Sequence, residues 1–177
     1  MMNFLRRRRG LLDAVVFSGG EPTLQDALPQ AIEEVRQLGF KIGLHTGGTY
    51  PARLKEILPL LDWVGMDIKA DFGDYARVTD TPGSGDKALE CARMLLDSGI
   101  ACEFRTTAHP LYHSPESLLH LAGTLRDLGV RNYALQEFRP QGCTNQQLNS
   151  HPPHELLAPA LCERIGAMFE HFSLRRG

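Results

Sequence analysis

The chain has 177 residues, which is enough for one domain with its own hydrophobic core. Apolar residues make up 42% and charged residues 23%, a composition that excludes disordered and collagen-like chains. Lys and Arg total 19 against 21 acids, and without the run Arg6 to Arg9 the balance is 15 against 21. A mildly acidic body argues against a nucleic-acid partner, and no apolar run is long enough for a membrane helix. We therefore expect a cytoplasmic protein with neither nucleic acid nor membrane as its partner.

Short apolar runs alternate with amphipathic segments along the chain. Strands are predicted at Ala14 to Phe17, Phe40 to Leu44, Trp63 to Ile68, Ile100 to Thr106 and Arg131 to Leu135. Apolar residues three and four positions apart predict a helix after each strand. Because parallel neighbours need such crossovers, the order predicts an α/β fold with about five β/α units. Five units are too few for a complete eightfold barrel, so we expect a partial parallel (β/α) barrel.

Three of the predicted helices carry further detail. Leu89, Ala92 and Leu96 mark the helix that precedes Gly99. Ser114 before Pro115 predicts a capped helix start. The buried stripe of that helix is predicted to be Leu118, Leu121, Ala122 and Leu125. A last helix is predicted from about Pro153, with Leu157, Leu161, Ile165, Met168 and Phe172 on its apolar face.

Polar residues and glycines follow every predicted strand. The five strand ends are Ser18 to Glu21, His45 to Gly48, Asp67 to Lys69, Arg105 to His109 and Gln136 to Arg139. Active sites of parallel α/β proteins form at the carboxyl ends of strands, so these residues are expected on one rim. Loops are polar in general, but that explains less well the two Gly-Gly turns and the Asp-x-Lys pair.

Gly19-Gly20-Glu21-Pro22 is the most informative tetrapeptide. Two glycines after a buried strand allow the backbone to approach a ligand closely, and the carboxylate of Glu21 suits an ammonium group. Pro22 fixes φ and leads into the following helix. The spacing matches neither a dinucleotide-binding G-x-G-x-x-G nor a P-loop. From these residues alone, a tight turn with an exposed acid is the alternative.

The sequence resembles the radical S-adenosylmethionine (SAM) enzymes. Ser-Gly-Gly-Glu-Pro-Thr after a Val-Val-Phe strand is similar to their GGEP motif. With Leu-His-Thr-Gly-Gly and Asp-Trp-Val-Gly-Met-Asp-Ile-Lys, it resembles the activating proteins of glycyl radical enzymes, particularly that of anaerobic ribonucleoside-triphosphate reductase. The similarity runs from about Phe4 to Arg139 and implies SAM as cofactor, the glycyl radical enzyme as partner and an electron donor such as flavodoxin.

The resemblance also implies a set of cofactor-binding residues. Gly19, Gly20 and Glu21 would hold the amino group of SAM's methionine moiety, and Asp67 and Lys69 would face its carboxylate. Thr46 matches the family's threonine, although His45 and Gly47 replace the usual Asp and Asn of that turn. Arg105 and Arg139 are expected to join the same rim. For Lys69, a plain surface cation is the alternative. No catalytic residue is assigned.

One family feature has no counterpart in the sequence. Radical SAM enzymes bind a [4Fe–4S] cluster through C-x-x-x-C-x-x-C before GGEP, whereas the first cysteine here is Cys91. Only 18 residues precede Gly19, so the chain is expected to begin inside the family domain, without its first strand and cluster loop. Residues 1–177 would then form a single truncated domain, with its core at about 4–139 and a C-terminal loop and helix at 140–177.

The cysteines and histidines suggest no metal site of their own. Cys91 and Cys162 fall in helical patterns and Cys102 in a strand pattern, as buried thiols do, whereas Cys143 lies in a loop. His109 and His113 are four apart, but the intervening Pro110 argues against a shared helical face. His151 and His154 flank two prolines in a predicted loop.

Two functions of different class remain open at this point. The chain is either part of a radical SAM activase and inactive alone, or a non-catalytic remnant that binds a partner. Another glycyl-radical activase of the same family is a variant of the first. The in-frame DNA upstream of Met1 discriminates, because a C-x-x-x-C-x-x-C pattern there indicates an enzyme.

Overall fold

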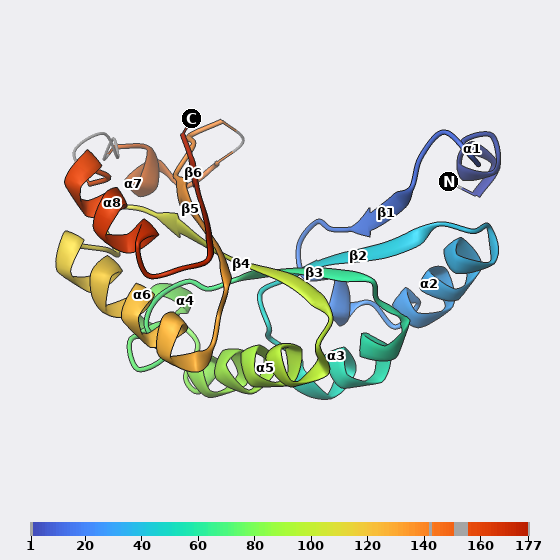
Figure 1. Ribbon diagram of the computed structural model, residues 1–177, viewed down its shortest axis with the longest axis horizontal. Coiled ribbons are helices and arrows are strands. Elements are labelled where there is room, and N and C mark those ends of the chain that lie inside the picture. Colours follow the sequence, from blue (N-terminus) through green and yellow to red (C-terminus); the bar gives the residue numbers. More distant parts are fainter. Residues whose placement is uncertain (1, 142, 151–155, 177) are drawn as a thin grey trace. The chain divides into compact units, whose positions relative to one another are not determined.

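The computed structural model describes residues 2–141, 143–150 and 156–176 (Figure 1). The chain divides into two compact units. Unit 1 comprises Met1–Met66 and Lys87–Cys102, and unit 2 comprises Asp67–Asp86 and Glu103–Gly177.

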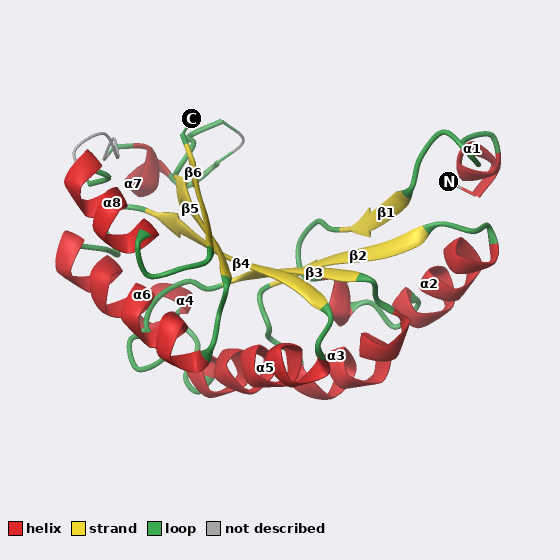
Figure 2. Ribbon diagram, viewed as in Figure 1, coloured by secondary structure: helices red, strands yellow, loops and turns green. Residues whose placement is uncertain are grey.

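Unit 1 contains three parallel strands in chain order. Its elements are α1 (Met2–Arg6), β1 (Ala14–Phe17), η1 (Pro22–Leu24), α2 (Leu28–Gln37), β2 (Lys41–Thr46), α3 (Pro51–Ile57), η2 (Leu58–Leu60), β3 (Trp63–Asp67) and most of α5 (Ser84–Ser98). Val16 pairs with Gly43, and Gly43 pairs with Trp63. Because the strands are parallel and adjacent, the loops that follow β1 and β2 lie at the same edge of the sheet. Figure 2 shows α2, α3 and α5 on one side of these strands.

The core of unit 1 lies between those strands and helices. Ile32 and Val35 of α2 are fully buried, as are Ile42 and Leu44 of β2. Burial of each such side chain stabilises the fold by about 1.5–3 kcal/mol. This packing fixes the end of β2 from which the turn at Thr46 begins.

Helix α5 buries Ala92 as predicted but not the other two residues of its predicted apolar pattern. Leu89 and Leu96 are only half-buried, and the fully enclosed residues are Ala88, Cys91, Ala92 and Leu95. The reason is a close approach of α5 to the turn after β2. A Cβ added to Gly48 would lie 3.4 Å from Ala88 Cα and 3.2 Å from Cys91 Cβ. Small residues are needed on the face of α5 that contacts this turn.

Unit 2 also contains parallel strands in chain order. Its elements are α4 (Tyr75–Thr79), β4 (Ala101–Ala108, most of it in this unit), α6 (Pro115–Leu128), β5 (Asn132–Glu137), α7 (Gln146–Asn149), α8 (Pro159–Gly166) and β6 (His171–Arg175). Thr107, Gln136 and Arg175 form one register row across β4, β5 and β6. The two units supply six parallel strands alternating with helices, which confirms the predicted α/β partial barrel.

Helix α6 forms as the sequence predicts. Ser114 is its N-cap, and its hydroxyl accepts from the backbone N–H of Ser117 while the Ser117 hydroxyl accepts from the backbone of Ser114. This reciprocal capping satisfies two amide groups at the helix start. The buried residues are those of the predicted stripe: Leu118, Leu121, Ala122 and Leu125.

The predicted last helix is wrong in its extent, because α8 ends at Gly166 and a sixth strand follows. Phe172 belongs to β6, and its ring lies against Gly166. A Cβ added to Gly166 would come within 2.9 Å of the Phe172 ring. Period-two alternation of Phe172 and Leu174 with polar neighbours was the signal for this strand. The predicted start at Pro153 lies outside the described residues, as do His151 and His154.

No helix in the described part of the chain is long and apolar enough to span a bilayer.

Candidate functional site

The turn after β1 requires glycine for its backbone conformation. Gly19 has φ +90° and Gly20 has φ +55°, values that side chains with a Cβ rarely adopt. A Cβ at either position would find no atom within 4 Å. The two glycines are therefore needed for the turn and not for packing within unit 1, and they leave open space beside the main chain.

The carboxylate of Glu21 is a hydrogen-bond centre for two loops of unit 1. Its Oε1 accepts from Thr23 Oγ1 at 2.6 Å, from the Thr23 amide at 3.2 Å and from Thr46 Oγ1 at 2.9 Å. Its Oε2 accepts from the Gly47 amide at 2.8 Å. Glu21 thus caps η1 and ties it to the turn after β2. A carboxylate has about four lone-pair sites, so Oε2 can accept one further donor.

Thr46 is the buried link between Glu21 and the second Gly-Gly turn. Its side chain is 3% exposed; it donates to Glu21 and accepts from the Gly48 amide at 3.0 Å. Gly48 has φ +71°, and a Cβ there would lie 2.5 Å from Met66 Cε. Within unit 1, then, Gly48 is explained by packing and by its backbone conformation. A close approach of ligand is not needed to account for it.

Cys91 of α5 binds the main chain of the turn that follows β2. Its Sγ donates to the Gly48 carbonyl at 3.4 Å. Burial, with smaller contributions from the charges of Glu90 and Glu21, raises the pKa of the Cys91 thiol to about 12. The group is a neutral thiol at ordinary pH, which suits a structural donor and makes it a poor metal ligand.

His45 stands where the family turn usually has Asp. Its Nδ1 lies 3.3 Å from Ser18 Oγ, and its ring meets the Trp63 ring edge-on with centroids 5.5 Å apart. Ser18 follows β1, and His45 lies next to the last residue of β2. This contact therefore joins the same two strand ends as the Glu21 network.

In unit 2, Asp67 and Arg105 form an ion pair. Arg105 Nε donates to Asp67 Oδ1 at 2.9 Å, and the arginine side chain is 8% exposed while that of Asp67 is 36% exposed. Asp67 ends β3, whereas Arg105, which the sequence predicts at a strand end, lies inside β4. The Ile68 amide also donates to the Arg105 carbonyl at 2.7 Å. A guanidinium that is buried this far needs a partner charge, and Asp67 supplies it.

Lys69 is exposed, and its ammonium has no hydrogen bond or ion pair to any residue that the structure describes. Arg139 has a different setting: its Nη2 donates to the Arg176 carbonyl at 2.7 Å. It lines a cavity of about 480 Å³ with Thr107, Gln136, Glu137, Phe138 and Arg175. In unit 2, therefore, Asp67 and Arg105 are joined directly, whereas Arg139 is bound to the C-terminal segment.

Two buried histidines have roles that sequence reasoning missed. His109 Nε2 lies 2.9 Å from the Leu148 carbonyl, and its Nδ1 accepts from the Leu111 amide at 3.1 Å. His113 Nε2 lies 2.9 Å from the Lys69 carbonyl. Both rings therefore bind main-chain atoms. The only signal for this was their apolar surroundings, which do not reveal which carbonyl a histidine binds.

The thiols lie in different elements, as predicted: Cys91 in α5, Cys102 in β4, Cys162 in α8 and Cys143 in a loop. Cys91 and Cys162 are buried, whereas Cys102 is only half-buried. Burial raises the pKa of Cys102 and of Cys162. Among the described residues, no group of three or more His, Cys, Asp or Glu side chains could hold a metal ion.

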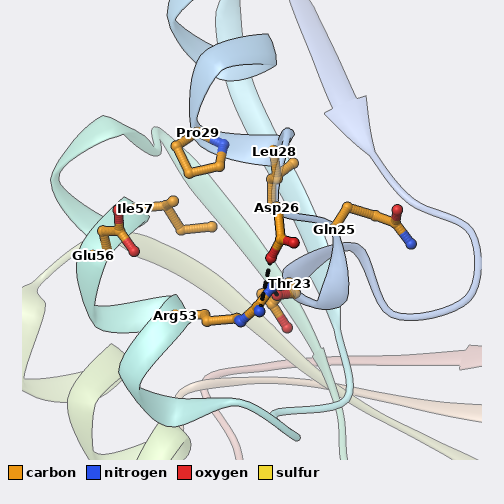
Figure 3. A pocket seen from close by; sticks show the side chains of 8 residues that line it. All are labelled: Thr23, Gln25, Asp26, Leu28, Pro29, Arg53, Glu56 and Ile57. Carbon is orange, nitrogen blue, oxygen red and sulfur yellow. Dashed lines mark hydrogen bonds and ion pairs between the residues drawn. The ribbon is translucent and has the colours of Figure 1, made fainter.

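A smaller cavity of unit 1, about 210 Å³, lies beside η1 (Figure 3). Arg53 lines it and is already engaged, with Asp26 at 2.8 Å and the Leu24 carbonyl at 2.8 Å. Leu28 and Ile57 form its apolar wall. Arg53 thus braces the segment after Glu21 against α3. Glu56 also lines the cavity, and its carboxylate has no hydrogen bond or ion pair to a described residue.

Comparison with known proteins identifies the class. The profile of the radical SAM superfamily matches residues 2–133, and the chain belongs to this superfamily. A proposed glycyl-radical enzyme activating enzyme of Methanocaldococcus jannaschii is 31% identical over 147 residues, which cover 79% of this chain and 60% of that protein. The 7-carboxy-7-deazaguanine synthase of Thermococcus kodakarensis is 34% identical over 97 residues, covering 54% of this chain and 37% of that protein.

A solved structure shows the same fold. A domain of the pyruvate-formate lyase-activating enzyme from Bacteroides vulgatus has a TM-score of 0.69 and 14% sequence identity, and the match covers 91% of this chain and 98% of that chain. The chain is thus a radical SAM protein that resembles glycyl-radical activating enzymes and 7-carboxy-7-deazaguanine synthases. It spans 60% and 37% of the lengths of the two relatives above.

Members of this superfamily in general use SAM and a [4Fe–4S] cluster, and the two groups fit the described residues differently. The open space at Gly19 and Gly20 and the remaining acceptor site on Glu21 Oε2 fit an amino group. The unpaired ammonium of Lys69 fits a carboxylate. No set of cluster ligands is present among the residues described.

Proposed function

We propose that this chain supplies the SAM-binding part of a radical SAM activase. In unit 1, Gly19, Gly20 and Glu21 bind the methionine amino group, and Thr46 holds Glu21 in place. In unit 2, Lys69 binds the carboxylate of SAM. When bound, SAM supplies the methionine and adenosyl groups, and the protein supplies binding and orientation.

The observation that carries this proposal is the empty space beside Gly19 and Gly20, next to a carboxylate with one acceptor site left. Open space of this kind also lies beside Gly10 and Gly39, so the space alone does not indicate a ligand; its place next to the Glu21 carboxylate does. The ion pair with Arg105 modifies the role expected of Asp67, because its charge is largely neutralised within unit 2. Asp67 then accepts hydrogen bonds beside Lys69 without repelling a carboxylate. Arg105 acts through Asp67, and Arg139 lines the 480 Å³ cavity of unit 2.

Equilibrium dialysis with radiolabelled SAM tests the proposal on the 177-residue chain. Gly20→Asn is the variant of choice, since Asn tolerates the left-handed region but its side chain fills the space. We expect about tenfold weaker binding, the value of one lost charged hydrogen bond. Gly10→Asn is the matched control, because Gly10 also has φ +75° with nothing within 4 Å of a Cβ. No binding by the wild-type chain, or equal binding by Gly20→Asn, would refute the proposal.

For the whole protein, we infer that it activates a glycyl radical enzyme, specifically anaerobic ribonucleoside-triphosphate reductase, with flavodoxin or a similar protein as electron donor. The support is the similarity to the M. jannaschii protein and the combination of Gly19 to Pro22 with Asp67 to Lys69. The described residues include no set of cluster ligands, so no step on a cluster is assigned to them. The upstream in-frame DNA should encode C-x-x-x-C-x-x-C, and the product of that longer frame should give the electron paramagnetic resonance signal of a glycyl radical on the reductase.

A second candidate function follows from the similarity to 7-carboxy-7-deazaguanine synthase. The same longer product distinguishes the two functions. Formation of 7-carboxy-7-deazaguanine without a glycyl radical would replace the activase assignment. If the upstream DNA lacks the cysteine pattern, the chain is a non-catalytic remnant.

A further inference from the structure

The loop after β3 is held by two buried side chains of unit 2. The backbone N–H of Lys69 donates to Tyr75 Oη at 3.1 Å, and Tyr75 Oη donates to the Asp67 carbonyl at 3.3 Å. On the other side of the Lys69 Cα, the carbonyl lies 2.9 Å from His113 Nε2. Tyr75 is 2% exposed and His113 is 7% exposed. The main chain of Lys69 is thus fixed through both its amide and its carbonyl.

The hydrogen bonds of His113 define its tautomer. The His109 amide and carbonyl lie 3.2 and 3.3 Å from His113 Nδ1, and Nε2 lies 2.9 Å from the Lys69 carbonyl, which can only accept. Nε2 therefore carries a proton, and in the neutral ring Nδ1 accepts from the His109 amide. Nε2 then donates to the Lys69 carbonyl. Burial lowers the pKa of His113, outweighing its backbone hydrogen bonds, which favours the neutral ring. A donor in this place suits a carbonyl that has lost its strand partner at the end of β3.

The same residue has an unrestrained side chain. Lys69 is exposed, and no described residue bonds its ammonium. A lysine that served only solubility would gain nothing from a buried tyrosine and a buried histidine dedicated to its backbone. A lysine that must present its ammonium to one anionic group does gain, because fixing Cα reduces the entropy lost on binding.

We infer that Tyr75 and His113 are positioning residues that aim the Lys69 ammonium at an anionic ligand group. The inference rests on the proposed function, under which that group is the carboxylate of SAM. Neither residue contacts the ligand; both act through the main chain of Lys69.

Three variants of the full 177-residue chain test this by SAM binding. Tyr75→Phe removes the hydroxyl and keeps the ring, and His113→Leu removes the donor. Each should weaken SAM binding about fivefold, the value of one net hydrogen bond. His113→Gln should bind within about twofold of wild type, because its amide nitrogen donates from nearly the position of Nε2. Tyr112→Phe is the control, since the Tyr112 hydroxyl has no hydrogen bond to any described residue.

A double-mutant cycle separates positioning from a general loss of structure. In a Lys69→Gln background, Tyr75→Phe should have no further effect on affinity, because the ammonium that it positions is gone. Hydrogen exchange at the Lys69 amide should accelerate in Tyr75→Phe and remain unchanged in Tyr112→Phe. This measurement does not depend on SAM.

The outcomes separate the inference from the proposed function. If wild type fails to bind SAM, the proposed function is wrong, and the role of Tyr75 and His113 toward SAM is wrong with it. If wild type binds and Tyr75→Phe binds equally, only the inference is overturned. The inference is also overturned if Tyr75→Phe weakens SAM binding by the same factor in the wild-type chain and in Lys69→Gln.

Discussion

Thr46 is predicted to stabilise unit 1 through its hydroxyl alone. Thr46→Val keeps the shape of the side chain, so packing at the end of β2 is preserved. The Gly48 amide, which bonds Thr46 Oγ1 at 3.0 Å in a buried site, is left without its acceptor, a loss of about 1–3 kcal/mol. Glu21 Oε1 loses one donor of three, which adds less because the other two remain. We expect the free energy of unfolding to fall by about 3 kcal/mol in total.

Trp63 makes this measurable within unit 1. It is the only tryptophan of the chain and lies in β3, beside the ring of His45. Urea unfolding followed by Trp63 fluorescence therefore reports on the unit that contains Thr46. With the slope of the transition unchanged, the midpoint should shift to lower urea in Thr46→Val.

Two further variants decide whether the hydroxyl is responsible. Thr46→Ser keeps the hydroxyl and should therefore retain most of the stability that Thr46→Val loses. Thr49→Val is the matched control in the same loop, because Thr49 is exposed and its hydroxyl has no hydrogen bond to a described residue. It should change stability by less than about 0.5 kcal/mol. A loss in Thr46→Val no larger than that of Thr49→Val would refute the network as a source of stability.

Three other predictions concern the same turn, its thiol and the cluster. Gly48→Ala should destabilise the chain more than Gly19→Ala in urea unfolding, since both have positive φ but only Gly48 has Met66 Cε within 2.5 Å of a new Cβ. Burial raises the pKa of Cys91 from its ordinary value of 9.0 to about 12, so the unfolded chain releases this proton first. Stability should therefore fall as the pH rises above 9, by at most about 1.4 kcal/mol per pH unit, and Cys91→Ala should flatten this slope. The 177-residue chain, reconstituted anaerobically with iron and sulfide, should show no stable [4Fe–4S] absorbance and produce no 5′-deoxyadenosine above a no-protein control; either signal would contradict the absence of a ligand set in the described residues.

The fold was largely predictable, because it rests on periodic burial. Helix α6 has the predicted cap and stripe, since Ser114 acts locally and the apolar spacing is regular. Strand β6 was missed because Phe172 also fitted a helical spacing that continued α8. The competing alternation of Phe172 and Leu174 is only two apolar residues long, too short to prevail over a five-residue helical pattern.

For the candidate residues, the sequence predicted positions near strand ends but not the interactions that these residues make. Glu21 and Thr46 were both expected at strand ends, yet their hydrogen bond joins positions 25 residues apart. Tyr75 and His113 were not expected at the site at all. Both bind main-chain atoms of Asp67 or Lys69, and every residue type except proline presents the same amide and carbonyl. Such contacts leave no trace in the sequence pattern.

The hydrogen bonds of Glu21 change the meaning of the Gly-Gly-Glu-Pro turn. If the carboxylate existed only for a ligand, it would be expected to point into open space with both oxygens available. Instead Oε1 is fully used by Thr23 and Thr46, and Oε2 already accepts from the Gly47 amide. The protein therefore fixes the carboxylate in advance and leaves one acceptor position. Under the proposed function, preorganisation of this kind lowers the entropy lost when an amino group binds, and the turn after β2 is then as necessary to the site as the motif itself.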